Sequence, residues 1–120
     1  MLLHKDITDK IIKAYYNVYN TLGYGFLEKV YENAMMIELQ KQGLHVQKQM
    51  PIKVFYENQL VGEYYTDILV DETVIVELKT PKTLCEEHEF QLLNYLKATE
   101  FGLLLNFGKE PQFKRKIFTN

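Results

Sequence analysis

The sequence of 120 residues has a single cysteine and no tryptophan. One thiol cannot form an internal disulfide, which excludes a disulfide-stapled scaffold and fits a reducing compartment. The chain also lacks a long unbroken apolar run, and charges interrupt residues 1–16 every few positions. That pattern argues against a signal peptide or a membrane span, so we expect a cytoplasmic protein with no membrane contact.

An excess of positive charge is missing as well, because 14 basic residues face 16 acidic residues and the net charge is −2. This balance argues against a protein that coats nucleic acid through bulk charge, so any contact must be local. The local candidates are Lys114, Arg115 and Lys116 near the C-terminus. Short basic runs are more often simply solvated, and that alternative stays open. The sequence contains no glycine-rich phosphate loop, so it gives no support for a domain that handles a free nucleotide.

The composition, with 47% hydrophobic and 25% charged residues, predicts one folded domain over residues 1–120. Helical spacing and capping signals predict helices over residues 7–22, 26–42 and 83–98. Alternating, β-branched or continuously apolar segments predict strands over residues 46–56, 59–70, 73–79, 101–107 and 113–118. The order ααβββαββ predicts an α/β (α+β) fold, a mixed central sheet flanked by helices.

The second predicted helix has one apolar stripe, formed by Phe26, Val30, Ala34 and Ile37, with Leu27, Tyr31 and Met35 beside it. Glu28 lies at the edge of this stripe. It either points into a cleft or is an ordinary N-terminal acid that favours the helix dipole. Glu38 falls within the apolar arc, and the sequence gives no role for it.

Three residues on neighbouring predicted strands suggest chemistry. Glu77 and Lys79 are two apart and therefore project from the same face of a strand. The short turn at residues 71–72 makes the preceding strand their neighbour, so Asp67 can lie opposite Glu77. Two converging carboxylates repel each other unless a proton or a cation joins them, and hard oxygen ligands suit Mg²⁺ or Mn²⁺. A lysine beside such an ion can assist metal-dependent phosphodiester hydrolysis.

The simpler alternative is an exposed strand end where Glu77 and Lys79 form only a solvated ion pair, which contributes little to stability. From these residues alone that alternative is favoured, and further motifs shift the balance. Residues 25–31 match the pattern GxxExxY, and Asp67, the Glu77-Leu78-Lys79 triplet and residues 91–96 (Gln-Leu-Leu-Asn-Tyr-Leu) follow in order. Together they resemble the GxxExxY family of the PD-(D/E)XK nuclease superfamily, from the second helix through residue 108.

The resemblance implies a restriction-endonuclease-like core and a role for each matching residue. Asp67 and Glu77 correspond to the metal-binding acids, Glu28 to a helix-borne carboxylate that joins them, and Lys79 to the catalytic lysine. Gln91 resembles the helix glutamine often found near such sites. Thr66 stands where the nominal motif has proline, and that proline is widely lost in the superfamily.

The implied activity is a nuclease that uses Mg²⁺ or Mn²⁺ to hydrolyse phosphodiester bonds in DNA. The alternative is a catalytically inactive domain of the same fold that binds nucleic acid or a protein partner. Tyr95, one turn after Gln91, is a weak candidate for contact with nucleic acid. A small acidic domain has little surface to embrace a duplex alone, so a homodimer or a partner subunit is expected.

Overall fold

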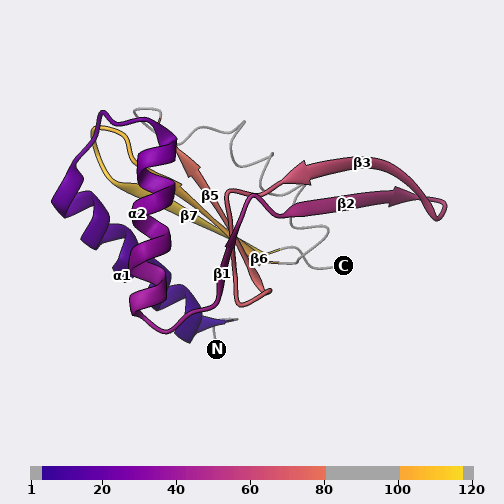
Figure 1. Cartoon of the computed structure of the whole chain (residues 1–120), viewed down its shortest axis with the longest axis horizontal. Helices are drawn as coiled ribbons and strands as arrows, with labels where there is room; N and C mark the ends of the chain where they lie inside the picture. Colours follow the sequence, from indigo (N-terminus) through magenta and orange to yellow (C-terminus); the bar gives the residue numbers. More distant parts are fainter. Residues whose placement is uncertain (1–3, 81–100, 118–120) are drawn as a thin grey trace.

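The computed structural model describes residues 4–80 and 101–117 (Figure 1). The predicted helix over residues 83–98, with Gln91 and Tyr95, lies outside these residues. The described elements, in chain order, are α1 (Lys5–Leu22), α2 (Glu28–Lys41), β1 (Val46–Lys48), β2 (Pro51–Tyr56), β3 (Gln59–Tyr65), β4 (Ile68–Val70), β5 (Val74–Lys79), β6 (Phe101–Asn106) and β7 (Gln112–Ile117). Neither described helix has the length and apolar character needed to cross a membrane.

Five strands form a mixed sheet in the order β1-β4-β5-β6-β7. The central pair, β5 and β6, is parallel, and the other neighbours in this sheet are antiparallel. Figure 1 shows α1 and α2 together on one side of the sheet. The predicted α+β class with a mixed central sheet is confirmed.

The prediction of two long strands over residues 46–56 and 59–70 is wrong in one respect, because each of them breaks in the middle. Gln49 adopts a left-handed backbone conformation, with φ 55°, which ends β1. The two breaks face each other: the amide of Gln49 donates to the carbonyl of Asp67 at 3.1 Å, and the amide of Thr66 donates to that of Met50 at 2.9 Å. Beyond them β2 and β3 form a separate two-stranded sheet that projects from the molecule (Figure 1).

The face of α2 that meets the core lies beside the main apolar stripe of the sequence. Tyr31, Met35 and Leu39, spaced four apart, are fully buried, whereas Phe26 and Ile37 are 46% and 60% exposed. The helix begins at Glu28 instead of residue 26, and the Tyr31 hydroxyl fixes the preceding turn: it donates to the carbonyl of Gly23 at 2.7 Å and accepts from the amide of Phe26 at 3.2 Å. The buried stripe is therefore the one beside the stripe predicted.

Glu38, whose role the sequence did not explain, lies near Lys41 at the end of α2. Its Oε1 is 3.5 Å from the ammonium nitrogen of Lys41, which is largely exposed. An ion pair of this kind on a helix surface contributes at most a few tenths of a kcal/mol, roughly. Glu38 thus has a local partner and no part in the site described below.

The two faces of the five-stranded sheet carry different side chains, because successive residues of a strand alternate between faces. The face beneath the helices is apolar and contributes Ile68, Val76, Leu78, Leu103 and Leu105 to the main core cluster. The opposite face carries the alternate residues, which include polar ones.

Candidate active site

Asp67 and Glu77 come together at adjoining ends of β4 and β5. The two strands pair antiparallel with Ile68 opposite Val76, and continuing this register by one residue places Asp67 opposite Glu77. Oδ2 of Asp67 accepts a hydrogen bond of 2.7 Å from the backbone amide of Leu78. This bond orients the Asp67 carboxylate toward β5, so the structure has the juxtaposition that the strand pattern predicts.

The carboxyl group of Glu77 is buried, and one of its oxygens lacks a hydrogen-bond partner among the described residues. The residue is only 5% exposed, and the oxygen without a partner in this part of the chain is Oε1. The pKa of Glu77 is raised to about 9, mainly by burial and then by the negative charge of Asp67 and a hydrogen bond shared with it. The positive charge of Lys79 lowers this pKa by a smaller amount. Without a cation this carboxyl group therefore holds a proton at neutral pH.

A divalent cation would satisfy the features that the acids leave open. It would neutralise the repulsion between Asp67 and Glu77 and give the buried Oε1 of Glu77 a partner. Within residues 4–80 and 101–117, no three acidic, histidine or cysteine side chains lie together as a group that could hold a metal ion. Asp67 and Glu77 are thus only two oxygen-donor residues, and Mg²⁺ held by such a pair would need water and substrate phosphate as further ligands.

Lys79 lies next to these acids at the end of β5. It projects from the same sheet face as Glu77, is half-buried, and opposes the rise in pKa of both Glu77 and Glu28. Its carbonyl accepts a hydrogen bond of 2.8 Å from the amide of Phe107, which ties the end of β5 to the end of β6. The ammonium group therefore acts electrostatically on carboxyl groups from two different elements.

Glu28 lies in the first turn of α2 and is affected by the charges of this region. The residue is largely exposed, and partial desolvation of its carboxyl group raises the pKa of Glu28. Lys79 opposes this rise, whereas Asp67 and Glu32 add to it. The charges of Lys79 and Asp67 therefore act on the Glu28 carboxyl group, which places it in the vicinity of that end of β5.

Glu32 is a neighbour of the site that the sequence interpretation missed. Glu32 lies one helical turn after Glu28 and is only 5% exposed. Its Oε2 accepts a hydrogen bond of 3.2 Å from the side-chain amide of Gln49, whereas its Oε1 has no hydrogen-bond partner within the described ranges. Gln49 also donates its backbone amide to the carbonyl of Asp67. Gln49 thus connects α2 to the strand that carries Asp67. The i,i+4 spacing of the two glutamates was the only signal in the sequence.

Replacing Gln49 with asparagine is expected to lower the free energy of unfolding by about 1–2 kcal/mol. Asparagine tolerates the left-handed backbone of this position, but its shorter side chain no longer reaches the buried carboxyl group of Glu32. Urea unfolding measures the change, and Gln59→Asn at the exposed start of β3 is the matched control. Equal effects of the two substitutions would show that the Gln49 side chain has no anchoring role.

The basic run is divided between the two faces of the sheet. Lys114 pairs with Leu104, which pairs with Glu77, so Lys114 shares the face of the candidate site. Arg115 pairs with Leu103 and therefore lies on the helix side, where its Nε is buried. The backbone of Lys116 pairs with that of Gly102. Lys114 and Arg115 thus lie on opposite faces of the sheet.

A family model of the PD-(D/E)XK nuclease superfamily matches residues 5–117, and the chain belongs to this superfamily. It is also similar to a solved structure described as the crystal structure of SSO0001, with a TM-score of 0.61 and 12% sequence identity. The match covers 98% of this chain and 58% of that chain, so the protein spans little more than half the length of its structural neighbour. No curated protein matches the sequence. Together these findings confirm the restriction-endonuclease-like fold.

Proposed function

We propose that this chain is a metal-dependent nuclease of the GxxExxY type that hydrolyses phosphodiester bonds in DNA. The observation that carries the proposal is the placement of Asp67 opposite Glu77, whose buried Oε1 lacks a partner in the described part of the chain, with Lys79 beside them. Membership of the nuclease superfamily gives the reaction class. The local charges supply a reason for the metal.

In this proposal Asp67 and Glu77 hold Mg²⁺ or Mn²⁺, with Glu28 contributing from α2. When bound, the ion would polarise a phosphoryl oxygen and favour ionisation of a water molecule. The ammonium group of Lys79 orients that water and offsets the negative charge that develops on the phosphate. Gln91 supports the site in this assignment through its match to the family motif.

The proposal also concerns where and with what the protein works. We assign it to the cytoplasm and to DNA, as its sequence led us to expect. The net charge of −2 gives the chain little overall electrostatic attraction for a duplex. A second copy of the chain or another subunit would then complete the contact, and Lys114 would meet phosphate beside the acids.

The partial ligand set supports a second candidate function, a catalytically inactive domain that binds nucleic acid or a protein partner. The two candidates separate in one experiment. Purified protein is incubated with fluorescent single-stranded, duplex and branched DNA, and with RNA, in Mg²⁺, in Mn²⁺ or in EDTA. The nuclease proposal expects ion-dependent cleavage that EDTA abolishes. If every substrate stays intact in both ions while binding persists in EDTA, the inactive domain is the correct function.

A further inference from the structure

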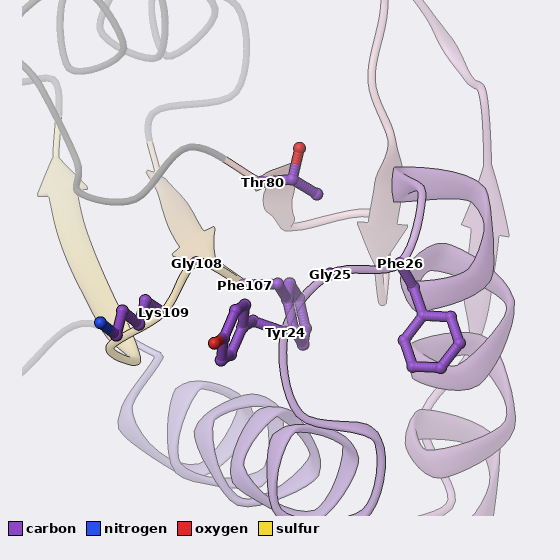
Figure 2. A pocket seen from close by; sticks show the side chains of 7 residues that line it. All are labelled: Tyr24, Gly25, Phe26, Thr80, Phe107, Gly108 and Lys109. Atoms are coloured by element: carbon purple, nitrogen blue, oxygen red, sulfur yellow. The ribbon is translucent and has the colours of Figure 1, made fainter.

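A pocket opens beside the candidate site, at the carboxyl ends of the parallel strands β5 and β6. Its volume is about 460 Å³, and it is lined by Tyr24, Gly25, Phe26, Thr80, Phe107, Gly108 and Lys109. Thr80 directly follows Lys79, and the 24–26 segment directly precedes the helix that carries Glu28. Figure 2 shows Lys109 on one side, Phe26 on the other, and Tyr24, Gly25 and Phe107 between them. The pocket thus lies at the end of β5 that carries Lys79.

The hydroxyl groups of two tyrosines hold the walls of the pocket in place. The Tyr31 hydroxyl bonds to the carbonyl of Gly23 and the amide of Phe26, which fixes the wall from α1 to α2. The Tyr19 hydroxyl lies 2.8 Å and 2.6 Å from the carbonyls of Gly108 and Lys109, which fixes the wall after β6.

The floor of the pocket is fixed as well. Phe107 stacks on Tyr31 with ring centroids 4.2 Å apart, and its amide is bonded to the carbonyl of Lys79. The pocket is therefore formed before a ligand arrives, and binding would cost little ordering of the protein.

The chemistry of the lining selects a flat ring attached to an anion. Tyr24 is 57% exposed, so its ring is accessible for stacking. Gly25 has φ 107° and no neighbour within 4 Å of where a Cβ would be, so its backbone lets a planar group approach closely. Lys109 is exposed and provides the cation. An aromatic surface beside a lysine is the combination that binds single-stranded nucleic acid.

We propose that this pocket binds one unpaired nucleobase of the substrate strand next to the scissile phosphate, with Tyr24 stacking on the base and Lys109 contacting an adjoining phosphate. The inference rests on the proposed nuclease function and specifies its substrate. Because the net charge is −2, phosphate contacts alone give weak affinity, and base stacking compensates for this. A base stacked within a duplex cannot enter the pocket, so the preferred DNA is single-stranded or unpaired at the cut.

The test measures binding without cleavage. The full chain in EDTA is titrated into fluorescent decathymidylate and into an abasic deoxyribose-phosphate strand of the same length and charge. We expect decathymidylate to bind about tenfold more tightly. Its addition should shift the amide NMR signals of Gly25, Thr80 and Gly108. Equal affinity for the two strands, or shifts confined to other residues, would overturn the proposal.

Variants separate stacking from charge. Tyr24→Ala should abolish the preference for decathymidylate. Tyr56→Ala should keep it, because Tyr56 is an exposed tyrosine on β2, away from the pocket. Lys109→Ala should weaken the binding of both strands equally and reduce the dependence of their affinity on salt concentration. If Tyr24→Ala retains the preference in a folded protein, the pocket is not the binding site.

The same measurements distinguish this proposal from the nuclease proposal. Since binding is read in EDTA, base-dependent affinity in the pocket stands even if no substrate is ever cleaved. Conversely, metal-dependent cleavage of duplex and single-stranded DNA at equal rates would overturn the pocket assignment and leave the nuclease assignment intact.

Discussion

Asp67→Asn is expected to lower the rate of metal-dependent DNA cleavage by about 100-fold or more. The asparagine side chain has nearly the same shape, and its oxygen can still accept the hydrogen bond from the amide of Leu78. What it lacks is the negative charge that would bind a cation together with Glu77. The substitution therefore tests the charge of the site while leaving the strand pairing in place.

The chain offers a closely matched control for this substitution. Oδ1 of Asp71 also accepts a backbone hydrogen bond, of 2.8 Å, from the amide of His45. Asp71, however, lies at the far end of β4 from Asp67. Asp71→Asn should retain cleavage within about twofold, a change too small to reflect loss of a transition-state contact. Rates are compared in single-turnover assays with saturating Mn²⁺. Equal activity of Asp67→Asn and the parent protein would remove Asp67 from the metal site.

The site was predictable where it depends on strand geometry. Glu77 and Lys79 share a face because of the two-residue period, and the short turn before β5 sets the register that brings Asp67 opposite Glu77. Neither inference needs information from distant parts of the chain. The sequence-based prediction of these three neighbours succeeded for that reason.

The long-range parts of the fold were harder to anticipate. The break at Gln49 depends on hydrogen bonds to residues 66–67, which lie next to it only after the hairpin has formed. A left-handed glutamine carries no sequence signal comparable to that of glycine. Glu32 appeared as a polar residue on a helix because its partner, Gln49, lies in a different element.

The GxxExxY segment also divides into structural and site residues in a way that spacing does not reveal. Gly25 adopts φ 107°, which disfavours other residues, and the Tyr31 hydroxyl bonds back to the loop before α2. Glu28 is the motif position whose carboxyl group is affected by the charges of Asp67 and Lys79. The glycine and the tyrosine thus shape the turn from which that carboxylate is presented.

Glu77→Gln is expected to make the metal-free protein more stable at pH 8, by roughly 1–3 kcal/mol, and to change it little at pH 4. Burial raises the pKa of Glu77 to about 9, whereas the unfolded chain has an ordinary value near 4.5. Below pH 4.5 the group is protonated in both states and has no effect on the pH dependence. Between pH 4.5 and 9 only the unfolded state ionises, so the stability of the parent protein falls as the pH rises.

Glutamine cannot ionise, so this contribution to the pH dependence should disappear in the variant, while its amide can donate to the carboxylate of Asp67 in place of the shared proton. A divalent ion should reverse the order of stability. Saturating Mg²⁺ or Mn²⁺ favours the ionised carboxylate and stabilises the parent by about 2–3 kcal/mol at a hundredfold excess over Kd, and the variant much less. Urea unfolding from pH 4 to 8.5, with and without metal, measures both effects. If, in EDTA, the stability of the parent protein rises with pH relative to that of Glu77→Gln, Glu77 is not protonated in the folded state. If metal stabilises both proteins equally, the ion binds elsewhere.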